Sequence, residues 1–229
     1  MKTYTCKYSL GLTLICLSGL SGILAPLFFI TVMLIVESLQ PAYNPWHDTI
    51  SWLVRGYYGW FQTLSFFVFG LLMAVFTLRL YTVMKRKATS VLGALFLLLS
   101  SLGFFSLGAF PVERGQTLPA LLHRFAAIDV GLFFILGCLA LAAYFRKDGQ
   151  WEKLWTYTAI TAIMSLSFFL IWILTPPEWQ LKGLSQRLLL ASGFLWLEII
   201  SIKLLGSCLR NRGQVPPSIN GATLGPPAT

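Results

Sequence analysis

Residues 91–110 read VLGALFLLLSSLGFFSLGAF, without a single charged side chain. The run from Leu92 to Leu99 is apolar at every position. Strands of a membrane barrel alternate apolar and polar residues over about ten positions, so this run favours a helix. A bilayer core about 30 Å thick is crossed by about 20 apolar residues, at about 1.5 Å of rise for each. The stretch therefore predicts a helix that spans a membrane.

Other stretches have the same character and bring the number of predicted spans to six. They cover residues 10–36, 57–80, 89–110, 118–145, 154–175 and 186–206. The first follows Lys2 and Lys7, as a secretory signal would, but its apolar run is much longer than the 7–15 residues of a signal core. We therefore interpret it as a retained helix. The sequence predicts an all-α polytopic membrane protein, with six transmembrane helices in three successive hairpins that form one domain, residues 10–206.

The composition of the 229-residue chain agrees with this prediction. Hydrophobic residues make up 56% of it and charged residues 11%, whereas a soluble protein is roughly a quarter charged. Too few polar side chains remain to cover a globular surface. These proportions exclude a soluble enzyme, a disordered scaffold and a small secreted disulfide-bonded protein.

The 17 Lys and Arg residues are divided unequally between alternating loops. One side holds twelve: Lys2, Lys7, Arg79, Lys85, Arg86, Lys87, Arg146, Lys147, Lys153, Lys203, Arg210 and Arg212. The other side holds five: Arg55, Arg114, Arg124, Lys182 and Arg187. Because positive side chains accumulate on the cytoplasmic side, we expect both termini in the cytoplasm. The net charge of +9 then reflects topology and contact with anionic lipid, and we expect no nucleic acid partner.

The two ends of the chain are expected to lie outside the membrane domain. Residues 1–9 are predicted to be a cytoplasmic N-terminus, and residues 207–229, rich in Gly, Pro, Ser and Thr, a disordered cytoplasmic tail. The cysteines all fall in or beside the cytoplasmic half: Cys6, Cys16, Cys138 and Cys208. Thiols stay reduced in the cytoplasm, so we expect no disulfide.

The longest predicted external connection, residues 37–56, contains His47, Asp48 and Ser51. Asp48 stands three residues before Ser51, and a carboxylate there suits the cap of a short interfacial helix. A functional carboxylate is the alternative interpretation. This connection is therefore the first place to look for an extracytoplasmic polar site.

Glu113 and His123 extend this predicted extracytoplasmic polar cluster. Glu113 lies in the second external connection, and His123 opens the fourth span on the same face as Ala120 and Ala127. A histidine on such a face is either a packing residue or loop anchor, or a ligand. The cluster has the side-chain types that bind zinc, but no compact metal-binding or hydrolase motif joins its members. We predict no metal ion and no cofactor.

Two acids lie deep inside predicted spans. Asp129 and Glu198 are each about 17 to 18 Å from the external helix end by helical rise, close to the middle of the membrane. A carboxylate there is costly, so each must face protein or water, become neutral or find a partner. A proton or ion relay is one interpretation, and a hydrogen-bonded clasp between helices is the other. The expected partners of a clasp are hydroxyls of the fifth span: Thr156, Thr158, Thr161, Ser165 and Ser167.

Both external connections resemble those of a known family. The first set of matching residues is Tyr43, His47, Asp48, Thr49, Ile50, Ser51, Leu53, Gly56, Tyr58, Gly59, Gln62, Phe66 and Gly70. Phe110, Pro111 and His123 form the second set, in which Glu113 replaces the more usual Asp. These residues resemble the DUF998 family of six-helix bacterial membrane proteins, over roughly residues 10–145. The family has no established activity, so the resemblance implies a multi-pass protein of the cytoplasmic membrane and transfers no catalytic role.

The expected role is a nonenzymatic membrane component that binds or passes a lipid or small solute through a polar pocket open to the extracytoplasmic side. One alternative is an intramembrane, metal-dependent hydrolase or transferase that acts on lipid through the same polar cluster. A structural subunit of a membrane complex is the other. Membrane lipid is the expected partner, and the oligomeric state is left open.

Overall fold

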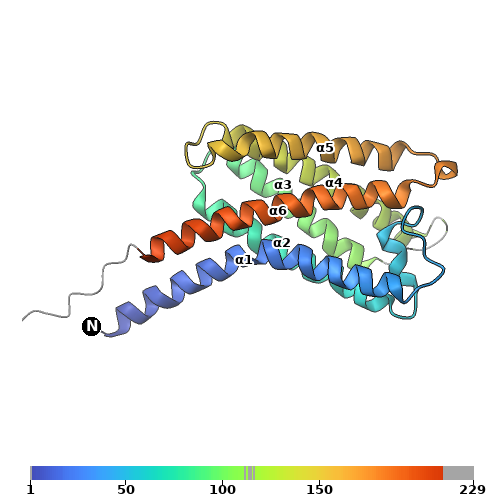
Figure 1. Cartoon of the computed structure of the whole chain (residues 1–229), viewed down its shortest axis with the longest axis horizontal. Coiled ribbons are helices and arrows are strands. Elements are labelled where there is room, and N and C mark those ends of the chain that lie inside the picture. Colours follow the sequence, from blue (N-terminus) through green and yellow to red (C-terminus); the bar gives the residue numbers. More distant parts are fainter. Residues whose placement is uncertain (1, 111, 113–114, 116, 214–229) are drawn as a thin grey trace, which may run out of the picture.

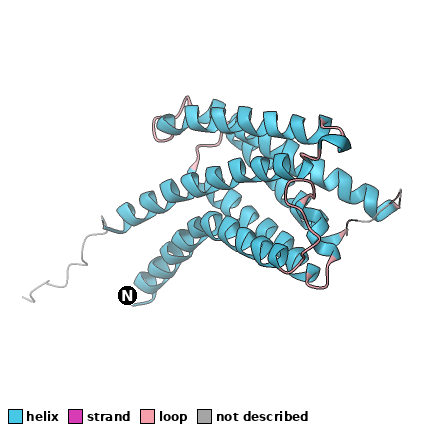
Figure 2. Ribbon diagram, turned by 45° about the vertical axis from the view of Figure 1, so that its right-hand side comes forward, coloured by secondary structure: helices cyan, strands magenta, loops and turns pink. Residues whose placement is uncertain are grey.

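The computed structural model describes residues 2–110, 112, 115 and 117–213, and within this part every regular element is helical (Figure 2). The helices in chain order are α1 (Lys2–Ser38), η1 (Ile50–Arg55), α2 (Gly59–Val83), α3 (Ala88–Ala109), α4 (Leu118–Phe145), η2 (Glu152–Leu154), α5 (Trp155–Leu174), η3 (Pro177–Trp179) and α6 (Lys182–Gly213). The elements labelled η are short 3-10 helices, and the α-helices form the body of the protein (Figure 1).

Six helical segments, one for each α-helix, are long and apolar enough to cross a membrane, and the fifth also includes η2. The segments are Ser18–Ser38, Gly59–Val83, Ala88–Ala109, Leu118–Phe145, Glu152–Leu174 and Lys182–Cys208. The prediction of an all-α membrane protein with six spans is confirmed. The helices extend beyond the predicted spans at both ends of the chain, since α1 begins at Lys2 and α6 continues to Gly213. The rest of the predicted tail, residues 214–229, lies outside the described part.

The six helices form a ring in which each packs against its neighbours in sequence and α6 returns to α1. Phenylalanines fill the centre of this ring. Phe29 of α1 lies 5.5 Å from Phe194 of α6, and Phe69 of α2 lies 4.3 Å from Phe104 of α3, measured between ring centroids. All four side chains are at least nine-tenths buried. The cavities that adjoin this cluster hold only about 30 Å³ each, which is about the space of one water molecule.

Small residues and hydroxyls bring the helices close together. The hydroxyl of Ser100 donates to the Val130 carbonyl at 2.9 Å, and that of Ser101 donates to the Gly70 carbonyl at 2.8 Å. These bonds join α3 to α4 and to α2. Gly22 of α1 has no room for a side chain, because a Cβ there would overlap Ser201. Close packing of this kind stabilises helices where lipid weakens the hydrophobic effect.

The expectation that no disulfide forms is wrong for one cysteine. Cys208, near the end of α6, is disulfide-bonded, whereas Cys138 is a free, buried thiol. In this region α6 packs along α1, where Gly19 lies against Leu205. Spacing along the sequence does not predict that α6 packs along α1.

Candidate functional site

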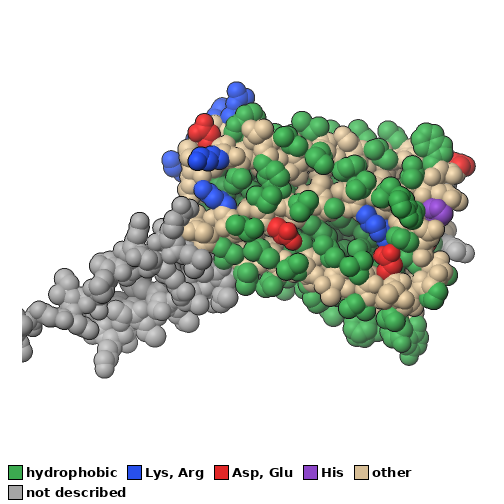
Figure 3. Space-filling model, viewed as in Figure 1, with side chains coloured by type: hydrophobic (Ala, Val, Ile, Leu, Met, Phe, Trp, Pro, Cys, Tyr) green, Lys and Arg blue, Asp and Glu red, His purple; other side chains and the backbone are tan. Residues whose placement is uncertain are grey.

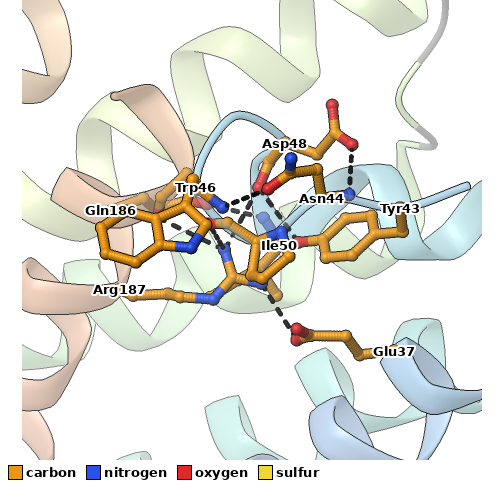
Figure 4. Close-up of polar contacts among 10 residues, drawn as sticks. Glu37, Tyr43, Asn44, Trp46, Asp48, Ile50, Gln186 and Arg187 are labelled. Atoms are coloured by element: carbon orange, nitrogen blue, oxygen red, sulfur yellow. Dashed lines mark hydrogen bonds and ion pairs between the residues drawn. The ribbon is translucent and has the colours of Figure 1, made fainter. Parts of the chain in front are cut away.

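The loop of residues 39–58 folds back onto the start of α6, and Arg187 holds it there (Figure 4). Nη1 of Arg187 donates to the carbonyls of Pro45, at 2.8 Å, and Asp48, at 3.2 Å. Its Nη2 donates to the Tyr43 hydroxyl at 2.7 Å and to Glu37 Oε2 at 3.1 Å. Arg187 therefore joins the end of α1, the loop and α6 in one network. We call the end of the bundle that carries this loop the loop end. The opposite end, where the connections contain Lys85, Arg86, Lys87, Arg146, Lys147 and Lys153, is the basic end.

Backbone contacts support the same docking. The Leu184 amide donates to the Trp46 carbonyl at 3.1 Å, and the Ile50 amide donates to Gln186 Oε1 at 2.7 Å. Gly183 lies directly against the loop, because a Cβ there would overlap the carbonyl oxygens of Pro45 and Asp48. The first turn of α6 is thus shaped to receive this loop.

Tyr43 is the titratable group of this network whose pKa departs most from its ordinary value. Burial raises the pKa of Tyr43 to about 12, although the neighbouring Arg187 lowers it in part. The Arg187 guanidinium also stacks on the ring, with its carbon 5.4 Å from the ring centroid. The phenol donates its proton to the Asp48 carbonyl at 3.0 Å. The neutral phenol is therefore the form that holds the loop.

Asp48 does not cap the short helix that follows it. Its Oδ2 accepts a hydrogen bond from the Asn44 amide at 2.9 Å, and so closes a turn on the N-terminal side. The residue before η1 is Thr49, whose side chain makes no capping bond. The predicted interfacial helix is present as η1, but the proposed cap is wrong because the carboxylate points back into its own loop.

A cleft of about 490 Å³ lies at the loop end, between η1, the start of α4, the end of α5 and the start of α6. Its polar lining consists of Thr49, Ser51, His123, Arg124, Lys182 and Gln186. Its apolar lining consists of Val112, Ala127, Ile128, Trp172 and Ile173. Among the described residues, two cations and no carboxylate line the cleft, so these side chains favour an anionic group.

His123 is buried in the wall of the cleft, with 4% of its surface exposed. Its Nδ1 lies 2.6 Å from the Phe110 carbonyl oxygen. Because a carbonyl only accepts, Nδ1 carries the proton, and Nε2 of the neutral ring is an acceptor. Nε2 is buried and has no hydrogen-bond partner among the described residues. His123 thus anchors the end of α3 and keeps one buried acceptor, without a described partner, in a side chain that lines the cleft.

The other polar groups of the cleft are mainly donors. Gln186 uses its Oε1 to accept from Ile50, which leaves its amide nitrogen as a donor. Nη2 of Arg124 donates to the Gly115 carbonyl at 3.2 Å, and the guanidinium carries further N–H donors. Lys182 adds a second positive charge at the start of α6. The described side chains of the cleft therefore offer several N–H donors, two hydroxyls that can donate or accept, and the neutral ring nitrogen of His123 as an acceptor.

The predicted polar cluster is only partly assembled. Ser51 and His123 both line the cleft. His47 is exposed, and Asp48 borders a separate surface hollow of about 470 Å³ on the other side of the loop. Glu113 lies outside the described residues. Within the described part of the chain, no three His, Cys, Asp or Glu side chains come together as a metal site would require.

The two acids within the spans, Asp129 and Glu198, are half-buried. No hydrogen bond or ion pair joins either to a described residue, although the Glu198 carboxylate lies near enough to Tyr157 to interact with it electrostatically. Four of the hydroxyls expected to pair with them bond elsewhere, and the Thr161 and Ser167 hydroxyls donate to carbonyls of their own helix. Thr158 accepts from the indole N–H of Trp196 at 3.1 Å, and the Ser165 and Ser192 hydroxyls lie 2.7 Å apart. A polar clasp between α5 and α6 therefore exists, but neutral side chains form it.

The sequence did not identify several residues of the loop end as part of a site: Glu37, Arg124, Lys182, Gln186 and Arg187. Arg187 was counted among the external cations, and its contact with Glu37 spans 150 positions of the chain. One available signal was helical spacing, since Gly183, Gln186 and Arg187 recur at intervals of three and four and share one face. That face is the one that receives the loop.

These features define an integral membrane protein, a bundle of six helices whose loop end holds a cleft with cationic and apolar walls. The family model described as "Protein of unknown function (DUF998)" matches residues 23–203, and the chain belongs to this family. The match continues through the last two helices, where the resemblance was expected to fade. Comparison with curated proteins gave no match. Comparison with solved structures gave none either.

Proposed function

We propose that this protein binds a lipid or another amphiphile in the cleft at its loop end, with the polar group near Arg124 and Lys182 and the apolar part against Trp172 and Ile173. The observation that carries the proposal is the combination of two cations and an apolar wall in one cleft of about 490 Å³, which no carboxylate of a described residue lines. That volume lies within the range of about 300–1,000 Å³ typical of ligand sites.

The position of the cleft suits a membrane ligand. It opens where η1 and the helix ends meet, and helix ends of a membrane protein lie at the depth of the lipid headgroups. Hydrophobic side chains spread over the helices on the face drawn in Figure 3, so lipid has access to the bundle from its sides. An amphiphile can therefore reach the cleft without leaving the membrane.

Binding is the proposed role, and passage across the membrane is not. The phenylalanine cluster of Phe29, Phe69, Phe104 and Phe194 fills the centre of the ring. The cavities beside it hold about 30 Å³ each, far below the roughly 300–1,000 Å³ of ligand pockets. This packing supports a ligand that is held at one end of the bundle.

The proposed orientation places the loop end outside the cytoplasm and the basic end inside, in the cytoplasmic membrane, with the helices as three successive hairpins. The unequal distribution of Lys and Arg supports it, and on the face in Figure 3 most of these side chains gather toward the basic end. The test is His47→Cys labelled with a membrane-impermeant maleimide in intact cells. Labelling only after the cells are opened would reverse the orientation.

The binding test uses variants that fill the cleft. Ala127→Trp and Ile173→Trp both place an indole on its lining, while Ala143→Trp adds the same side chain on an exposed face of α4. Protein purified in a neutral detergent is mixed with phosphatidylglycerol, phosphatidylethanolamine and phosphatidylcholine, and retained lipid is counted by native mass spectrometry. Wild type and Ala143→Trp should retain lipid that Ile173→Trp and Ala127→Trp lose.

Two results would contradict a binding role. Equal retention by the cleft variants and wild type would mean that lipid binds elsewhere. Lipid recovered with its headgroup removed or exchanged would favour the hydrolase or transferase alternative. The unfolding temperature of each variant is measured as well. Ile173 is about half-exposed, so Ile173→Trp should fold even if Ala127→Trp does not.

A further inference from the structure

We propose that the cleft selects a phosphate ester that carries a hydroxyl group close to the phosphate, as the headgroup of phosphatidylglycerol does. The phosphate oxygens would contact Arg124 and Lys182, and the hydroxyl would donate to Nε2 of His123. This inference rests on the proposed function and names the ligand class for the same cleft.

The first step is the charge of the ligand. Arg124 and Lys182 line the cleft, and no carboxylate of a described residue lines it with them, so an anion is favoured. Arg124 uses Nη2 for the Gly115 carbonyl, and its planar guanidinium still offers further N–H groups. Guanidinium groups bind phosphate oxygens through charge-assisted hydrogen bonds, and lysine adds a point charge. An ammonium headgroup would be repelled by the same two side chains.

The second step concerns the hydrogen-bond donors and acceptors of the side chains that line the cleft. Ser51 and the amide nitrogen of Gln186 add neutral donors to the two cations. A ligand that satisfies them must be rich in acceptor oxygens, as a phosphate ester is.

The third step is the histidine. Nδ1 of His123 is committed to the Phe110 carbonyl, so Nε2 needs a donor, and no described residue supplies one. A phosphate diester without a hydroxyl has no donor to give, and phosphatidylcholine has none either. Phosphatidylglycerol has both the anionic phosphate and hydroxyl donors. The ring nitrogen therefore distinguishes between anionic headgroups of equal charge.

The experiment compares three lipids and one soluble ester by isothermal titration into the full-length protein in a neutral detergent. Phosphatidylmethanol has the charge of phosphatidylglycerol but no hydroxyl, phosphatidylcholine has neither net charge nor hydroxyl, and glycerol 3-phosphate has phosphate and hydroxyls but no acyl chain. Phosphatidylglycerol should bind about tenfold more tightly than phosphatidylmethanol and more tightly still than phosphatidylcholine.

Variants assign each preference to a side chain. Arg124→Gln and Lys182→Gln should each weaken phosphatidylglycerol binding about tenfold, whereas Arg55→Gln, which removes an exposed cation that does not line the cleft, should not. His123→Asn retains a donor for the Phe110 carbonyl and lacks the second ring nitrogen. It should abolish the preference for phosphatidylglycerol over phosphatidylmethanol and leave binding of phosphatidylmethanol unchanged.

The outcomes separate this inference from the proposed function. If the three lipids bind equally well and Ile173→Trp prevents all of them, the headgroup inference is overturned and the amphiphile site stands. If phosphatidylglycerol binds Ile173→Trp as it binds wild type, both proposals fail. If glycerol 3-phosphate binds as tightly as phosphatidylglycerol, the phosphate-hydroxyl class stands and the source is a soluble ester, not a lipid.

Discussion

Glu37 and Arg187 connect the end of α1 to the start of α6, with Oε2 and Nη2 3.1 Å apart and 150 positions between them in the chain. Only 18% of the Arg187 side chain and 21% of the Glu37 side chain are exposed. Partial exclusion of water strengthens hydrogen bonds to these charged groups. The same guanidinium also binds two loop carbonyls, so a single side chain fixes the loop that forms one wall of the cleft.

Arg187→Gln should lower the free energy of unfolding by about 2–3 kcal/mol, because Glu37 and the loop carbonyls lose a charged donor. Thermal unfolding of the purified protein in detergent measures the change. Lys153→Gln removes an exposed cation at the basic end and should leave the midpoint where it is. Equal midpoints for Arg187→Gln and wild type would show that the network contributes nothing to stability.

The raised pKa of Tyr43 predicts a loss of stability in alkali. Its pKa is about 12 in the folded protein against an ordinary value of 10.0. The contribution of Tyr43 to stability is therefore complete below about pH 10 and disappears as the pH rises through about 12. Unfolding midpoints measured from about pH 9 to 12.5 should fall more steeply for wild type than for Tyr43→Phe. Parallel curves would exclude this titration.

Gly183→Ala should displace the loop of residues 39–58, because the new Cβ overlaps the carbonyl oxygens of Pro45 and Asp48. The expected cost is about 1–3 kcal/mol of stability, together with faster cleavage of the loop in limited proteolysis. Gly206→Ala is the matched control in the same helix, since a Cβ there meets nothing within 4 Å. Proteolysis of Gly183→Ala at the wild-type rate would mean that the loop does not need this close contact.

Asp129→Asn and Glu198→Gln should leave stability unchanged or raise it. Neither carboxylate makes a hydrogen bond or ion pair with a described residue, and an unpartnered carboxylate in a span is costly. Trp196→Phe, which removes the bond to Thr158, should instead lower stability by about 0.6–1.7 kcal/mol. Urea or thermal unfolding compares the three variants. A large loss of stability in either acid variant would instead indicate that the carboxylate joins two helices, as the clasp interpretation requires.

Most of the fold could be predicted from the sequence because the signal for a membrane span is local. Uncharged runs such as residues 91–110 determine both length and helical structure. The helix ends were less predictable. α6 continues to Gly213, past the apolar segment, since polar residues also form helix once a stable helix precedes them.

The candidate site was predictable only in part, because it depends on contacts between distant segments. Ser51 and His123 were recognised by residue type and position, and both line the cleft. Gln186 and Arg187 were not recognised, since their partners Ile50 and Glu37 lie in other elements. Only the three-dimensional path of the loop decides that Asp48 turns away from the cleft toward Asn44.

The closure of the ring by α6 also sets an order of events during biosynthesis. Residues 39–58 leave the ribosome early, but the Arg187 side chain that holds them is made 150 positions after Glu37. At about 5–20 residues per second, this interval lasts roughly 8 to 30 s. During that time the nascent chain carries a long loop without its receptor helix, and insertion factors would meet the first helices before the final one secures them.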